Sequence, residues 1–263
     1  REFDRFLAIM VQLSRTGNTE ISLIESIFAS MAQNGNVSAV NGLLEGLYSL
    51  VVNQVPEAGE LLSSLLSIES SIVLKDMFDQ NASSFKSILT KLVAVENFRA
   101  DGLVELLQHL PLGESRSVLQ EILLHSSVDM TRFYMQGLQD DDEDIVLESL
   151  EALGKIDSDA SLQALYGSLG HSLTAVRAKA LAAINGRYLP GQAKSLGKVL
   201  KDPDEANRLL ALEICHKIVD REVGNIILGV MQEIGFNRRP MDEQHQFYQT
   251  LHKYPCPTTF QFL

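Results

Sequence analysis

The stretch LQDDDEDIVLESLEALGKI (residues 138–156) returns 62 residues later as LKDPDEANRLLALEICHKI (residues 200–218). Both begin with Leu, continue through an acidic run and an apolar stripe, and end in Lys-Ile. Leu169 stands midway between the two starting leucines, so the repeating period is 31 residues. A fixed period of this length is typical of proteins that are built from stacked helical repeats.

Apolar residues recur at the same offsets when the three repeats are counted from Leu138, Leu169 and Leu200. At offsets 12, 15 and 27 they are Leu150, Leu181 and Leu212, then Leu153, Ile184 and Cys215, then Leu165, Leu196 and Ile227. Within one repeat they form two groups at helical spacing, so we predict two short amphipathic helices per repeat. Such a pair cannot bury its apolar stripe alone, but it can bury it against a copy of itself.

Turn residues predict where these helices begin and end. We predict that Asp202 is the N-cap of a helix and that Pro203 is its first residue. Glu205, three residues after the cap, would complete a capping box. Gly154 and Gly186 lie near the ends of the first helices, where a left-handed residue is often needed.

The repeat pattern weakens toward the N-terminus. One repeat earlier the same offsets hold Leu107, Leu119, Ile122 and Tyr134, and before that Met77, Leu89, Leu92 and Leu103 follow with a slip of one residue. Helical stripes continue as Val40, Leu43, Leu47 and Val51, as Ile21, Ile24, Phe28 and Met31, and as Phe3, Phe6, Leu7 and Met10. We therefore predict three regions: a helical cap or irregular repeats over 1–56, degenerate repeats over 57–137, and regular repeats with a C-terminal helix over 138–263.

Three stretches are similar to HEAT repeats, of the type found in bacterial HEAT-like proteins: residues 138–156, LTAVRAKALAAI (residues 173–184) and LKDPDEANRLLALEI (residues 200–214). The family pattern of Asp, Val-Arg and Ala-x-x-Ala-Leu is met at Val176-Arg177 and more weakly at Asn207-Arg208. Val146 replaces the Arg of the first repeat and His171 the Asp of the second, so an unbroken Asp–Arg ladder is not expected. The resemblance implies an all-α, right-handed α-α superhelix, a HEAT-like solenoid of antiparallel helix pairs.

Composition excludes several classes of partner and location. The formal net charge of −12 disfavours binding to nucleic acid or to an anionic membrane surface. No apolar run approaches the length of about 18 residues that membrane insertion needs. Two cysteines, Cys215 and Cys256, are too few for a disulfide framework, so we expect a reducing, cytoplasmic location. The chain begins with Arg and we expect it to be a piece of a longer protein or a processed form; its oligomeric state is not predicted.

The sequence carries no recognisable catalytic or cofactor motif. The phosphate-binding, dinucleotide-binding, zinc-protease, CxxC and nucleophile-elbow patterns do not occur in it. The acidic run Asp140–Asp144 lacks the spaced ligands and the central Gly of a calcium loop. Carboxylates at a helix start are stabilised by the helix dipole, which favours a solvated helix start instead. We expect no catalytic residue, no cofactor and no bound metal.

Charge is segregated along the repeats. Residues 138–159 contain nine acidic residues and one lysine, a net charge of −8, whereas residues 160–201 contain no acidic residue and six basic ones. One interpretation is that neighbouring repeats of opposite charge attract each other. The other is a basic patch for an acidic peptide or a phosphate-bearing partner, with the candidate residues Arg177, Lys179, Lys194, Lys198 and Lys201. Lys194, Lys198 and Lys201 are spaced as one stripe on a second helix, and second helices usually line the concave side in this family, whereas Arg177 begins a first helix.

These observations predict a non-enzymatic scaffold that binds a partner protein or acidic peptide on the solenoid surface. Two alternatives stay open. One is a HEAT-like lyase-type enzyme that acts on a chromophore-bearing partner, and the other is a purely structural spacer within a longer chain.

Limited proteolysis tests whether residues 1–56 form a separate cap. A cap hinged near Asn53–Pro56 should be cut there early, because a hinge exposes its backbone to the protease. A continuous stack of repeats should resist cleavage at this site. Timed digestion followed by mass spectrometry of the fragments distinguishes the two.

Overall fold

The structure is a computed structural model that describes residues 18–96, 98–126 and 128–254. Within these ranges every regular element is a helix, which confirms the all-α prediction, and no strand is present. No helix of this part of the chain combines the length and the apolar character that crossing a bilayer requires. The contacts divide the chain into unit 1 (Arg1–Asp129) and unit 2 (Met130–Leu263). The boundaries predicted after residues 56 and 137 stay predictions.

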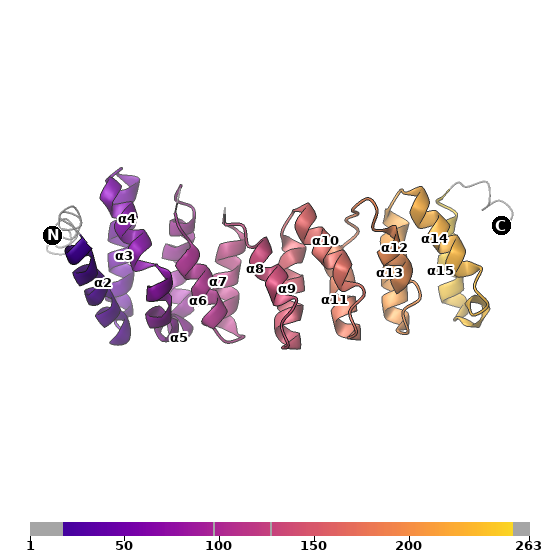
Figure 1. Ribbon diagram of the computed structural model, residues 1–263, viewed down its shortest axis with the longest axis horizontal. Coiled ribbons are helices and arrows are strands. Elements are labelled where there is room, and N and C mark those ends of the chain that lie inside the picture. Colours follow the sequence, from indigo (N-terminus) through magenta and orange to yellow (C-terminus); the bar gives the residue numbers. More distant parts are fainter. Residues whose placement is uncertain (1–17, 97, 127, 255–263) are drawn as a thin grey trace. The chain divides into compact units, whose positions relative to one another are not determined.

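Unit 1 contains six described helices (Figure 1): α2 (Asn18–Gln33), α3 (Val37–Val52), α4 (Pro56–Leu65), α5 (Ile68–Val93), α6 (Asp101–His109) and α7 (Glu114–Leu124). Short turns separate α2 from α3 and α3 from α4. Gly35 takes a positive φ of 66°, and the Asn36 side chain accepts a hydrogen bond from the Ala39 N–H at 3.1 Å. The stripe predicted over Phe3–Met10 lies outside the described residues.

Helix α5 is kinked in its middle. Asn81 departs from helical geometry, with φ −137° and ψ 25°, and its Nδ2 donates to the Met77 carbonyl oxygen at 2.9 Å. The side-chain amide thereby satisfies a carbonyl group near the break in the helix, where a local side-chain-to-backbone bond competes with regular helix geometry. The segment therefore forms one kinked helix.

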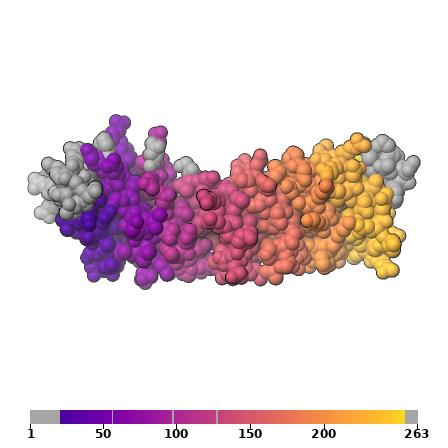
Figure 2. Space-filling view, viewed as in Figure 1, coloured from indigo at the N-terminus to yellow at the C-terminus, as the bar shows by residue number. Residues whose placement is uncertain are grey.

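Unit 2 is built from α8 (Thr131–Gly137), α9 (Glu143–Lys155), α10 (Asp159–Ser168), α11 (Thr174–Ile184), α12 (Ala193–Val199), α13 (Glu205–Lys217), α14 (Arg221–Met231) and α15 (Met241–Leu251). Its helices pack in two rows. In one row α9 contacts α11, α11 contacts α13 and α13 contacts α15; in the other, α8, α10, α12 and α14 follow one another. Side chains fill the space between neighbouring helices of this unit (Figure 2).

The repeated apolar positions form the core of unit 2. All nine residues at offsets 12, 15 and 27 are buried, as the 31-residue period predicted. In the terminal helix α15, Phe247 and Leu251 are fully buried, and Tyr254 just beyond it is nearly so. Each fully buried side chain of this size stabilises the fold by about 1.5–3 kcal/mol relative to an exposed one.

Two local predictions are wrong. The N-cap of α13 is Asp204, whose side chain accepts from the Asn207 N–H at 3.1 Å, because the Asp202 carboxylate is bound by the neighbouring repeat instead. Gly154 lies inside α9 and does not end it. A Cβ at this position would lie 3.0 Å from the Ala183 Cβ, so Gly154 permits close packing of α9 on α11.

Gly102 is predicted to be indispensable for packing in unit 1. A Cβ on this residue would lie 2.0 Å from the Leu66 carbonyl oxygen, a backbone atom that cannot rotate away. Gly102→Ala should therefore lower the urea midpoint of unfolding, with a cost of about 1–3 kcal/mol or more.

Gly59→Ala is the matched control, because this glycine is also helical and a Cβ there meets nothing within 4 Å. It should raise stability by about 0.4–1 kcal/mol. Equal effects of the two substitutions would contradict the packing argument.

Candidate partner-binding surface

The structure separates the five predicted binding residues into two groups. Lys194, Lys198 and Lys201 line one groove between α12 and α14. Arg177 and Lys179 lie in ion pairs that connect neighbouring repeats. The five residues therefore do not form one patch.

The groove, called here the lysine groove, has a volume of about 460 Å³. Its apolar surface comes from Gly197 on α12 and from Ile226, Gly229 and Val230 on α14. A Cβ on Gly197 would lie 2.6 Å from the Ile226 Cγ2, so the glycine lets the two helices approach closely. A Cβ on Gly229 would meet nothing within 4 Å, which leaves open space above that part of the groove.

The three lysines of the groove differ in what surrounds them. Lys201 lies just past the end of α12 and forms an ion pair with Glu233. Lys194 and Lys198 are one helical turn apart on α12 and both are exposed. Neither has an ion-pair partner within the described part of the chain. The groove therefore keeps two ammonium groups beside an apolar surface.

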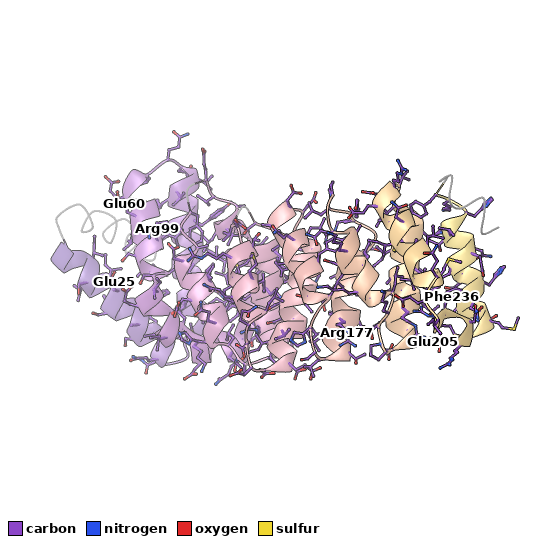
Figure 3. The ribbon with its side chains drawn as sticks, turned by 45° about the vertical axis from the view of Figure 1, so that its right-hand side comes forward. Glu25, Glu60, Arg99, Arg177, Glu205 and Phe236 are labelled. Atoms are coloured by element: carbon purple, nitrogen blue, oxygen red, sulfur yellow. The ribbon has the colours of Figure 1, made fainter. Side chains whose placement is uncertain are left out.

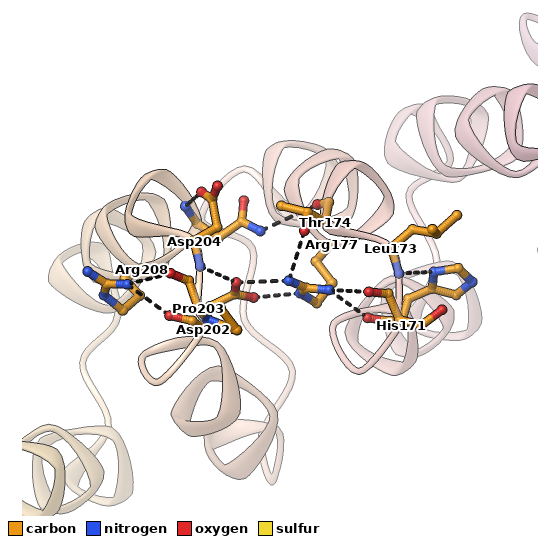
Figure 4. Close-up of polar contacts among 10 residues, drawn as sticks. His171, Leu173, Thr174, Arg177, Asp202, Pro203, Asp204 and Arg208 are labelled. Carbon is orange, nitrogen blue, oxygen red and sulfur yellow. Dashed lines mark hydrogen bonds and ion pairs between the residues drawn. The ribbon is translucent and has the colours of Figure 1, made fainter.

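Arg177 acts as a bridge between two repeats (Figure 4). Its Nη2 donates to the Asp202 Oδ1 at 2.9 Å, and its Nη1 donates to the backbone carbonyls of His171 at 2.9 Å and Ser172 at 2.8 Å. The Asp202 side chain is only 2% exposed. Hydrogen bonding to Arg177 holds the pKa of Asp202 below its usual value, and Asp202 raises the pKa of Arg177.

Arg208 repeats this arrangement one repeat later. It donates to the backbone carbonyls of Asp202 and Pro203, and its Nε and Nη2 each lie 2.7 Å from one oxygen of the Glu243 carboxylate. Arg239 donates to the same carboxylate at 2.8 Å, and its guanidinium lies over the Phe247 ring at 5.0 Å. The buried Glu243 thus ties α15 to the third repeat.

Burial alone would raise the pKa of Glu243, but the guanidinium groups of Arg208 and Arg239 outweigh it and lower the pKa. The carboxylate is 0% exposed and is therefore held as an ion by its two partners.

An arginine of unit 1 shows a related contact. The buried Arg116 donates through Nη1 to the carbonyl oxygens of Leu107 at 2.6 Å and Leu110 at 3.1 Å. In Arg116, Arg177 and Arg208 alike, the guanidinium binds the carbonyl six residues earlier. In the sequence, the signal for this structural role was that Arg177 and Arg208 stand one 31-residue period apart.

The segregated charges meet across repeat boundaries. Lys179 pairs with Glu151 of the first repeat at 2.7 Å. The first repeat has Val146 in place of the arginine that bridges the later repeats, so this ion pair joins the first repeat to the second. Tyr188 donates to the Asp220 carboxylate at 2.8 Å and covers the seam between repeats. Attraction between neighbouring repeats therefore accounts for Arg177, Lys179 and Lys201, and leaves Lys194 and Lys198 unexplained.

The acidic run caps α9. The Asp142 side chain accepts from the Asp144 N–H at 2.9 Å, and the Asp140 side chain accepts from the Asp142 N–H at 2.9 Å. This agrees with the interpretation of a solvated helix start. Among the described residues, no group of three or more His, Cys, Asp or Glu side chains is placed to hold a metal ion. Burial raises the pKa of the Cys215 thiol to about 12, so it is a core residue and not a nucleophile.

Comparisons with known proteins give little. No protein-family model matches the chain, and no curated protein matches it. Among solved structures, the crystal structure of an engineered protein from the Northeast Structural Genomics Consortium is similar at 14% identity, with 94% of this chain and 77% of that chain covered and a TM-score of 0.35. A likeness at this level carries no argument about family or function.

The buried Glu243 is predicted to control how acid affects unit 2. Its pKa is lower in the folded protein than in the unfolded chain, so its contribution to stability is present above the unfolded value of about 4.3 and is lost as the pH falls through the folded pKa. Glu243→Gln should lower stability at pH 7 by about 3–5 kcal/mol, because two guanidinium groups that are mostly shielded from solvent lose their counter-ion. In this variant the free energy of unfolding should also fall less steeply as the pH drops below about 5.

Urea unfolding of wild type and variant across this pH range measures both effects. Glu233→Gln is the control, since its pair with Lys201 is about half exposed and is worth less than about 1 kcal/mol. A pH profile of Glu243→Gln parallel to that of wild type would contradict the assignment.

Proposed function

We propose that this chain is a HEAT-like right-handed α-α superhelix that acts as a non-enzymatic, cytoplasmic scaffold. It binds an acidic segment of a partner protein in the lysine groove. The resemblance of three repeats to HEAT sequences, the helix pairs and the stacked rows of unit 2 support this fold. A repeat stack presents extended surfaces without needing a reactive pocket, which suits a binding function.

The observation that carries the proposal is the placement of Lys194 and Lys198. Three other cations of the basic stretch, Arg177, Lys179 and Lys201, each form an ion pair with a carboxylate and so have a structural explanation. Lys194 and Lys198 instead project beside the apolar surface of Ile226 and Val230. A peptide that carries both carboxylates and an apolar side chain complements this combination of charge and hydrophobic surface.

The charge requirement can be tested with a labelled peptide. A fluorescein-labelled 12-residue peptide of Asp, Glu and two Leu should bind the wild-type chain, and its Asn/Gln counterpart should bind more weakly. Lys194/Lys198/Lys201→Glu should weaken binding by about tenfold or more, because attractive charge pairs become repulsive ones. Fluorescence anisotropy measures the Kd.

Lys75/Lys91/Lys217→Glu changes the net charge by the same amount outside the groove and is the matched control. If both triple variants lose binding equally, the groove is not the site. Affinity capture from the native lysate with the same three proteins then tests for a natural partner. A protein that is captured by wild type and by the control, but not by the groove variant, supports the scaffold. Equal capture by all three contradicts binding in the lysine groove and moves the site elsewhere, whereas no specific capture by any of them favours the spacer or the enzyme.

A further inference from the structure

Unit 1 contains a second cleft that the lysine groove does not involve. It has a volume of about 740 Å³ and lies between α4, the start of α5 and the connection from α5 to α6. Figure 3 labels Glu60 on α4 and Arg99 on that connection, which both line the cleft. Its size is within the range of about 300–1,000 Å³ that ligand pockets occupy. We call it the acidic cleft.

Two glycines shape this cleft. Gly102 allows the start of α6 to approach the Leu66 carbonyl, which draws the end of α4 and the start of α6 together. Gly59 lines the cleft, and a Cβ added there would meet nothing within 4 Å. At Gly59 the cleft is therefore bounded by backbone, and the space beside it holds no side chain.

Apolar side chains lie both inside the cleft and beside it. Leu62 and Leu66 are buried at its base, and Phe98 is half-buried. Ile68 lines it at 49% exposed, and Ile72, one helical turn further along α5, is 67% exposed. Large exposed apolar side chains that adjoin a cleft are typical of a surface that another molecule covers.

The charged residues of the cleft are mainly acidic. Glu60, Glu69, Glu96 and Asp101 line it, against the single cation Arg99. Arg99 pairs with Asp101 at 3.1 Å, so three carboxylates remain without that partner. Hydrogen bonds from its own backbone N–H and from the Ser67 hydroxyl lower the pKa of Glu69, which keeps this group ionised.

We propose that the acidic cleft binds a basic amphipathic segment of a partner protein. One or two apolar side chains of that segment enter between Leu62 and Phe98, and its Lys or Arg side chains face Glu60, Glu69 and Glu96. Charge complementarity selects this occupant, because an acidic segment or a nucleic acid would be repelled by the same carboxylates. The cleft lies in unit 1, whereas the lysine groove lies in unit 2, and the two carry opposite charges. The cleft is therefore a second interaction surface.

Three labelled 18-residue peptides serve as probes: a Leu/Lys amphipathic helix, the same peptide with Leu replaced by Ser, and the same peptide with Lys replaced by Glu. The full chain should bind the first most tightly, and added NaCl should weaken that binding. Glu60/Glu69/Glu96→Gln should raise its Kd by about tenfold, since exposed charge pairs contribute modestly and add up. Gly59→Trp, which fills the cleft, should raise the Kd of the same peptide at least as much.

Matched variants separate the cleft from the general negative charge of the chain. Asp140/Asp141/Asp144→Asn removes the same number of carboxylates from unit 2, and Gly167→Trp adds the same side chain at a helical glycine with equally open surroundings. Both should change the Kd by less than about twofold. Equal losses in the matched variants, or equal binding of the Ser-containing peptide, would overturn the proposal.

Circular dichroism confirms that each variant is folded. The acidic peptide that tests the lysine groove should still bind the cleft variants, so failure of the acidic cleft and failure of the lysine groove give different results.

Discussion

Burial of one helix pair against the next is the constraint on which unit 2 depends. Its helices are short, with 13 residues in α9 and 10 in α10, and helices of this length are marginal in water on their own. Each pair carries an apolar stripe that only a neighbouring pair can cover. This explains why the apolar residues recur every 31 positions and why all nine of the repeated core positions are buried.

Polar contacts then set how one repeat joins the next. Arg177 and Arg208 each bind backbone carbonyls in the turn of their own repeat and a carboxylate of the following one. A planar guanidinium with five donors can satisfy both sets of acceptors at once, which a lysine cannot do. The carboxylate of Asp202 or Glu243 is buried as a result and depends on its arginine. The stack is therefore held by hydrophobic contact and aligned by ion pairs.

These same ion pairs decide which charges are left for a partner. A basic stretch of six cations resembles a binding patch in the sequence, but three of them, Arg177, Lys179 and Lys201, pair with carboxylates of neighbouring repeats. Lys194 and Lys198 remain beside an apolar surface in unit 2, and Glu60, Glu69 and Glu96 line the acidic cleft in unit 1. In the proposed scaffold, these two surfaces would hold two partners of opposite charge.

The sequence by itself determined the helical class, the 31-residue period, the core positions from Leu150 to Ile227, and the stripe of lysines, because helical periodicity and charge are local properties of the chain. It could not determine that Arg177 is a structural bridge, that Asp202 leaves the N-cap to Asp204, or that Gly154 and Gly102 are packing glycines. Those assignments depend on atoms 25 to 36 residues away or in another helix. Only the tertiary structure decided them, because only folding brings such atoms within contact distance.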